Sequence, residues 1–115
     1  MAIDVNQLVR DITQAVSGVL NRDITTVGGF SERQVLALAQ HAALIEAGIL
    51  NGQITADTQG FFLDSLKEMT LNFIKTLRGL LSITIEKAWN AAVSVLWKAI
   101  ETGTGIMLPL PGPKA

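Results

Sequence analysis

The stretch MTLNFIKTLRGLLSITIEKAWNAAVSVLWKAI, residues 69–100, decides the fold of this chain. It contains no proline and one glycine, Gly79, and most of its side chains are apolar. A membrane span, a buried strand and a long helix covered by neighbours all fit such a composition. The spacing of the polar residues separates these three possibilities.

Polar residues recur along one line with a mean step of about 3.7 residues, close to the helical period and far from the period of two in a strand. The line consists of Asp64, Glu68, Asn72, Lys75, Gly79, Ser82, Glu86, Asn90, Ser94, Lys98 and Glu101. Its phase continues past Gly79, which predicts one continuous helix over residues 56–101. The alternative is a break near Gly79 that gives four short helices in all.

A simple membrane span is not expected in this region. Glu86 and Lys87 lie near the middle of residues 79–100, and each charge costs roughly 2.5–3.5 kcal/mol at the centre of a membrane helix. The large aliphatic residues return only roughly 0.3–0.6 kcal/mol each. The insertion free energy is therefore unfavourable.

Two shorter helices are predicted before the long one. Residues 4–21 have helical apolar spacing behind Asp4 as N-cap, and residues 32–50 follow a Ser31–Gln34 capping box. The second helix is apolar on nearly all sides, so we expect it at the centre of the fold or of an assembly. The predicted fold class is all-α, with helices 4–21 and 32–50 packed on the long C-terminal helix 56–101.

The C-terminal residues GTGIMLPLPGPKA, 103–115, cannot be helical because three prolines interrupt them. Their apolar side chains predict an extended arm that docks onto a neighbouring copy. These docking residues are Ile106, Met107, Leu108 and Leu110. The chain is thus divided into a helical domain, residues 1–102, and an arm, residues 103–115.

The composition indicates that part of the surface is hidden. Apolar residues make up 49% of the chain and charged residues 17%, whereas soluble domains carry about 25% charged residues. Two short helices cannot cover the wide apolar arc of residues 56–101, which predicts a homo-oligomeric bundle. The expected oligomer interface consists of Leu66, Met69, Phe73, Leu77, Leu81, Ile85, Trp89, Val93, Leu96, Trp97 and Ile100.

Several function classes are disfavoured. The net charge is -1 with scattered basic residues, so no positive field is available for nucleic acid. The absence of cysteine excludes disulfide scaffolds and cysteine catalysis. No catalytic motif or metal-ligand spacing is evident, so a non-enzyme without cofactors is expected. Asp4 interrupts any signal-peptide pattern, which favours the cytoplasm or an assembled particle as location.

Three local features have a plain structural interpretation. His41 lacks the E-x-x-H and H-E-x-x-H spacings of helical metal sites, so a packing role is favoured over a ligand. Asp64 and Glu68 are one helical turn apart. We expect them to lie on a solvated face rather than to bind a cation. The Gly28-Gly29 loop lacks the lysine of a phosphate loop, so a turn is favoured over an anion site.

The tryptophans and the polar line each allow two interpretations. Trp89 and Trp97 fit an oligomer interface better than membrane anchoring. The polar line faces solvent in the favoured case, and it lines a channel between packed copies in the alternative.

Three functions are compatible with these features. The leading hypothesis is a self-assembling structural protein, a subunit or adaptor of a ring, a filament or a phage or injection-type particle, acting through the long amphipathic helix. A membrane-active protein that inserts or forms a pore on oligomerisation is the second. A small regulator that binds the helix of another protein is the third.

Overall fold

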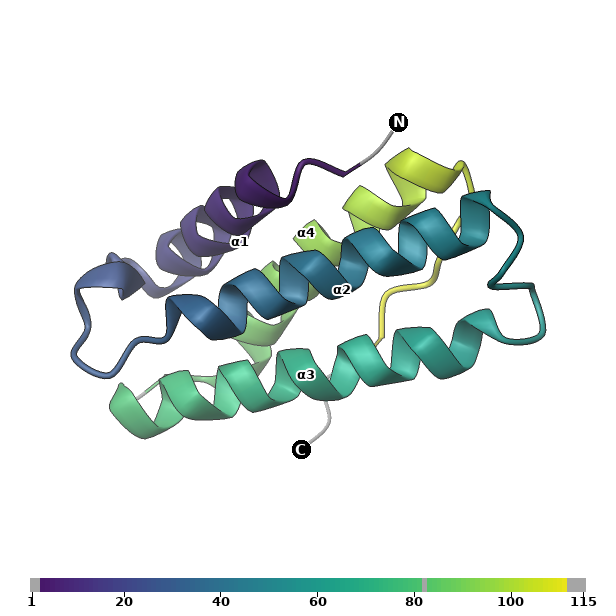
Figure 1. Ribbon diagram of the computed structural model, residues 1–115. Helices are drawn as coiled ribbons and strands as arrows, with labels where there is room; N and C mark the ends of the chain where they lie inside the picture. Colours follow the sequence, from purple (N-terminus) through teal and green to yellow (C-terminus); the bar gives the residue numbers. More distant parts are fainter. Residues whose placement is uncertain (1–2, 82, 112–115) are drawn as a thin grey trace.

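The computed structural model describes residues 3–81 and 83–111, and these residues form an all-helical fold, as predicted. The elements are α1 (Val5–Leu20), the short 3-10 helix η1 (Ile24–Thr26), α2 (Glu32–Leu50), α3 (Gln59–Leu80) and α4 (Ile85–Thr104). Figure 1 shows α2 and α3 side by side in opposite directions, with α4 behind them. α2 and α4 each pack against the other three long helices, so these two helices share the centre of the bundle.

The starts of the first two long helices confirm the predicted caps. The Asp4 side chain accepts a hydrogen bond from the Gln7 amide at 3.1 Å, and Ser31 accepts from the Gln34 amide at 3.3 Å. The capping box is only half formed, because Gln34 Oε1 has no hydrogen-bond partner among the described residues. The Gln34 side-chain nitrogen donates to the Thr76 hydroxyl of α3 at 3.4 Å. Asn21 ends α1 in the left-handed conformation, with φ 57°.

The prediction of one continuous helix over residues 56–101 is wrong. α3 ends at Leu80, and Leu81 is extended. α4 begins at Ile85, with Thr84 at the N-cap position. A straight helix of that span would be about 69 Å long, whereas the longest extent of the chain is 41 Å. The alternative with four helices is the observed arrangement, and its break lies at residues 81–84 rather than at Gly79.

The break has a local and a global cause. Ile83, Thr84 and Ile85 are β-branched in succession, and such residues lose side-chain freedom in a helix. Turning the chain here also lets the apolar sides of α3 and α4 cover each other and the other helices, which a straight rod cannot do. The free energy of burial therefore favours the turn over helical continuity.

The polar line keeps its phase because both helices have a solvent-facing side. The described members of the line on α3 and α4 are exposed, apart from the half-buried Glu101. Ser82 lies outside the described residues. In the single chain, the polar line therefore faces solvent, as the favoured interpretation predicts.

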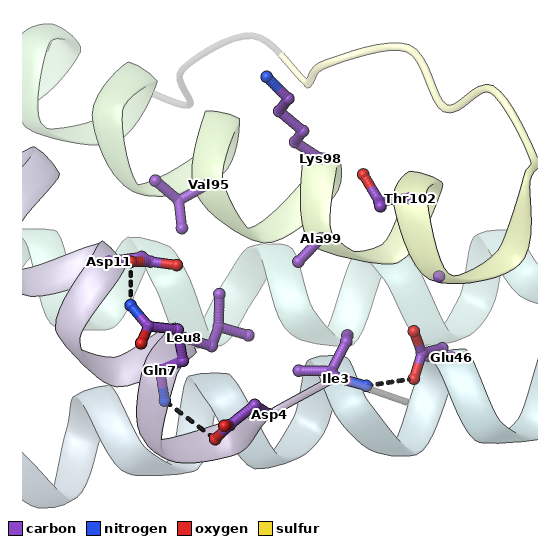
Figure 2. A pocket seen from close by; sticks show the side chains of 11 residues that line it. Ile3, Asp4, Gln7, Leu8, Asp11, Glu46, Val95, Lys98, Ala99 and Thr102 are labelled. Carbon is purple, nitrogen blue, oxygen red and sulfur yellow. Dashed lines mark hydrogen bonds between the residues drawn. The ribbon is translucent and has the colours of Figure 1, made fainter. Parts of the chain in front are cut away.

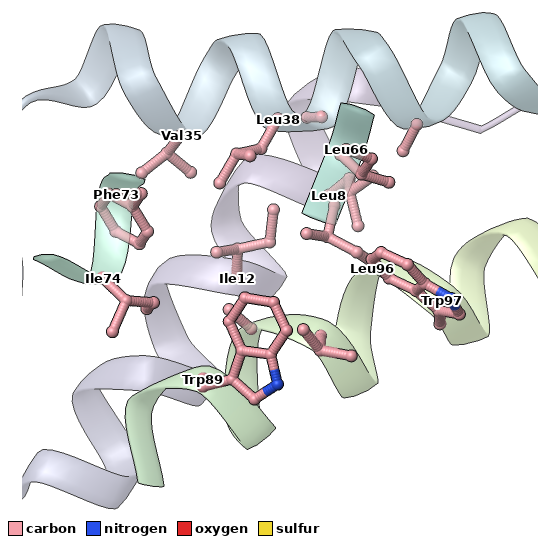
Figure 3. Packing of buried hydrophobic residues seen from close by; sticks show 14 of the residues in the cluster. Leu8, Ile12, Val35, Leu38, Leu66, Phe73, Ile74, Trp89, Leu96 and Trp97 are labelled. Atoms are coloured by element: carbon pink, nitrogen blue, oxygen red, sulfur yellow. The ribbon is translucent and has the colours of Figure 1, made fainter. Parts of the chain in front are cut away.

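The hydrophobic core lies where the four long helices meet. Figure 3 shows Ile12 of α1, Leu38 of α2, Phe73 of α3 and Trp89 of α4 in this region, and all four are almost fully buried. Each such side chain stabilises the fold by roughly 1.5–3 kcal/mol relative to an exposed one. The expected central position of α2 is confirmed for one side only, since its other side faces outward.

The segment after α4 is extended, as predicted, but it packs on its own chain. Gly105 ends α4 with φ 75°, and the chain then turns back across the bundle toward α3 (Figure 1). The Leu108 amide donates to Glu101 Oε2 at 3.0 Å, and the Trp89 indole donates to the Pro111 carbonyl at 3.1 Å. The arm therefore packs on its own bundle, and its docking onto a neighbouring copy stays a prediction.

Candidate functional site

The residues predicted to form the oligomer interface lie in the core of the chain itself. Eight of them are at most 3% exposed: Leu66, Phe73, Leu77, Trp89, Val93, Leu96, Trp97 and Ile100. Met69, Leu81 and Ile85 are half-buried. The apolar arcs that called for a partner are covered by α1, α2 and each other, so a second copy would have to contact other residues.

The predicted docking residues of the arm divide into two sides. Leu108 is buried and Ile106 is half-buried, while Met107 is 89% and Leu110 is 57% exposed. The first two hold the arm on its own bundle. The last two remain available on the surface.

The remaining candidates have ordinary surroundings, except that the buried Nε2 of His41 has no hydrogen-bond partner among the described residues. Asp64 is exposed and lies 3.4 Å from the Lys67 ammonium, as expected of a solvated face. His41 is half-buried, and no group of three or more metal-binding side chains occurs among the residues described. Gly28 and Gly29 form a turn, with φ 89° at Gly29, in agreement with the favoured interpretation.

An uncharged surface on α2 is the most unusual exposed feature of the molecule. We define the α2 outer face as Ala37, Gln40, Ala43, Leu44, Ala47 and Leu50. Leu44 is 68% and Leu50 is 55% exposed, and the remaining members are exposed or half-buried. Phe61, near the start of α3, is 78% exposed. The end of α2 and the start of α3 lie at the same end of the molecule (Figure 1).

No charge interrupts this face. Between Arg33 and Asp57 the only charged residue is Glu46, and its side chain is buried. The uncharged part of α2 is therefore roughly 25 Å long at 1.5 Å per residue. The outward side of a surface helix normally carries charged residues, whereas the centres of protein interfaces are depleted of them.

Sequence reasoning registered the missing charge but misread its meaning. The absence of Lys, Arg and exposed acids is consistent with a helix that is buried on all sides. It is equally consistent with a helix that has one apolar side on the surface. The alanines of α2 fall on both its buried and its outward sides, so their spacing alone does not reveal which side is covered.

A pocket between α1 and α4 is the second feature that sequence reasoning missed (Figure 2). Its inner end is Glu46 of α2, which lies far along the chain from the other lining residues. No periodic pattern predicts that an acid on a buried side of one helix meets a gap between two others.

Among the residues that the structure describes, no helix combines the length and the apolar character needed to cross a membrane. Comparison with protein-family models, with curated proteins and with solved structures finds no match to this chain.

Proposed function

We propose that this chain is a non-enzymatic helical protein that works by self-assembly, with the α2 outer face as the contact between copies. The supporting observation is a solvent-facing helix side without charge, on which Leu44 and Leu50 are more than half exposed. Large exposed apolar groups of this kind mark interaction surfaces in soluble proteins. The long C-terminal region supplies the core of each subunit, and α2 supplies the contact.

A second copy is the partner that suits this face best. Leu44 lies near the middle of the uncharged stretch, and the small side chains of Ala37, Ala43 and Ala47 surround it along the helix. A twofold axis close to Leu44 would place leucines against alanines on two antiparallel α2 helices. Such an isologous contact is self-complementary, because large and small side chains alternate in both copies.

The arm offers a route from dimers to larger assemblies. Met107 and Leu110 are exposed on a segment that is already extended and held by Leu108. A contact through these two side chains, in addition to the α2 outer face, would join dimers into a ring, a filament or a larger particle. The α2 contact forms first in this scheme, since it is the longer surface.

The experiment compares two substitutions that each place an acid on an exposed apolar position. Leu44→Glu introduces a charge at the centre of the α2 outer face, and Val19→Glu introduces the same charge on α1, where Val19 is also exposed. Size-exclusion chromatography with light scattering should show an oligomer for the wild type and for Val19→Glu, and a folded monomer for Leu44→Glu.

Other outcomes point to other functions. An oligomer that survives Leu44→Glu would place the contact elsewhere on the chain. A wild-type monomer that binds lipid vesicles and releases their contents would favour the membrane-active alternative. A wild-type monomer that binds an added amphipathic helix but does not self-associate would favour the helix-binding regulator.

A further inference from the structure

The pocket between α1 and α4 has the size of a small-molecule site. Its volume is about 410 Å³, and ligand pockets in proteins typically measure roughly 300–1,000 Å³. Figure 2 shows α1 and the segment before it on one side, α4 on the other and Glu46 of α2 at the inner end. Its walls are predominantly apolar, with Leu8 on α1 and Val95 and Ala99 on α4.

Glu46 is a buried acid with unused hydrogen-bonding capacity. The residue is 2% exposed, and its Oε1 accepts from the Ile3 amide at 2.7 Å. No residue in the described ranges donates to its Oε2, which is shielded from solvent. A buried carboxylate with an unpaired oxygen is costly unless a donor or a cation compensates it.

Gly103 of α4 makes room for this oxygen. A Cβ at that position would overlap Glu46 Oε2, so only glycine lets α4 pass the carboxylate at this distance. Glycine costs helix stability compared with alanine. The glycine in the last turn of α4 therefore provides space for the Glu46 carboxylate and does not favour the helix itself.

The charges around the pocket favour a cation. Asp4 and Asp11 line it on the α1 side, and together with Glu46 they outnumber Lys98, the single cationic side chain among the described lining residues. The Lys98 side chain is exposed and points away from Glu46 (Figure 2), so it does not neutralise the buried acid. A local excess of carboxylates raises the concentration of cations at the entrance.

We propose that this pocket binds a small primary amine on an apolar body, with the Glu46 carboxylate as its counter-ion. The ammonium donates to Oε2 and supplies the missing charge-assisted hydrogen bond. The apolar body lies along Leu8, Val95 and Ala99. A zwitterion such as a free amino acid is disfavoured, because its carboxylate would lie beside Asp4 and Asp11.

Binding requires a small movement at the inner end of the pocket. Because Oε2 is closed to solvent, the ligand reaches it through a shift of the Glu46 side chain or of the segment that carries Ile3. The Ile3 amide is bonded to the same carboxylate. Its NMR resonance should therefore respond to an amine more strongly than to a neutral ligand.

The test titrates the full ¹⁵N-labelled chain with n-hexylammonium chloride, and with 1-hexanol and sodium hexanoate as ligands of the same length. We expect saturable shifts of the Ile3, Gln7 and Thr102 amides with hexylammonium. Hexanol should bind about tenfold or more weakly, and hexanoate should not bind, because a hydrogen bond to a charged group contributes more than a neutral one. Equal affinities for hexylammonium and hexanol would overturn the proposal.

Variants separate the role of Glu46 from a general effect of charge. Glu46→Gln keeps an acceptor for the Ile3 amide but removes the charge, and it should lower hexylammonium affinity about tenfold or more without changing hexanol affinity. Glu86→Gln removes an exposed carboxylate of α4 outside the pocket and should bind hexylammonium as the wild type does. Unchanged binding by Glu46→Gln would contradict the proposal.

A second variant tests the pocket without altering the acid. Ala99→Phe fills the space beside Leu8 and should abolish binding of hexylammonium and hexanol alike, whereas unchanged binding would place the ligand elsewhere. Leu44→Glu, which alters the outward side of α2, should bind hexylammonium with wild-type affinity. Amine binding and self-assembly can therefore fail independently.

Discussion

At the residue scale, the contact between Glu46 and Gly103 links two helices that are distant in sequence. Glu46 lies on a buried side of α2, and Gly103 lies in the last turn of α4. The acid also holds the Ile3 amide ahead of α1. One buried carboxylate therefore fixes the relation of three elements.

Replacing Gly103 with alanine should destabilise the fold by about 1–3 kcal/mol, because the added methyl group overlaps the Glu46 carboxylate. Urea unfolding of the variant measures this change. In the double variant Gly103→Ala with Glu46→Ala the overlap is gone, so the added cost of the methyl group should disappear. A strictly additive result in this double-mutant cycle would contradict the proposed contact.

The carboxylate of Asp23 should titrate below its usual range. It accepts hydrogen bonds from the Thr25 hydroxyl at 2.6 Å and from the Thr25 amide at 3.0 Å, and these bonds lower the pKa of Asp23 from 3.8. Because the folded-state pKa is lowered, this small stabilisation is present at neutral pH and is lost as the pH falls through that pKa. NMR titration of the side chain should show the lowered pKa, and Thr25→Val should raise it.

At the element scale, the turn between α3 and α4 shows what periodicity reveals and what it leaves open. The spacing of polar residues identified which side of each helix faces solvent, from Asp64 through Lys98. It did not reveal that the chain turns at residues 81–84, since two helices with solvent-facing sides can share a phase across a short turn. The cost of exposing both apolar arcs on a straight rod decides the turn, and that cost depends on the whole fold.

Gly79 should be replaceable, because the turn does not depend on it. A Cβ at Gly79 meets no atom within 4 Å, and its φ is not in the left-handed region. Gly79→Ala should therefore stabilise the protein by about 0.5–1 kcal/mol through helix propensity in α3. Thermal unfolding checks this, and a lower midpoint than that of the wild type would show that the chain needs glycine there.

The arm should stabilise its own subunit through Leu108. Leu108→Ala removes a buried side chain and should lower the free energy of unfolding by about 2–5 kcal/mol. Met107→Ala, at the adjacent exposed position, should change it by no more than about 0.5 kcal/mol. Equal effects of the two substitutions would contradict the position of the arm on its own bundle.

At the scale of the whole molecule, the chain buries its main apolar residues internally and leaves one helix side uncharged. The sequence was sufficient to predict an all-helical fold, the extents of α1 and α2, and an extended arm. It was not sufficient to predict which apolar surface remains outside, because that depends on how four helices share their sides. The low charge content is explained largely by the core, and the α2 outer face is an uncharged surface that stays exposed in the single chain.

Sedimentation velocity of the unmodified protein over a concentration series tests the proposed self-assembly most directly. The chain has a mass of 12.3 kDa. Assembly through the α2 outer face predicts a weight-average mass that rises with concentration to at least twice this value. A mass of 12.3 kDa at every concentration, for a folded protein, would contradict self-assembly as the function of this chain.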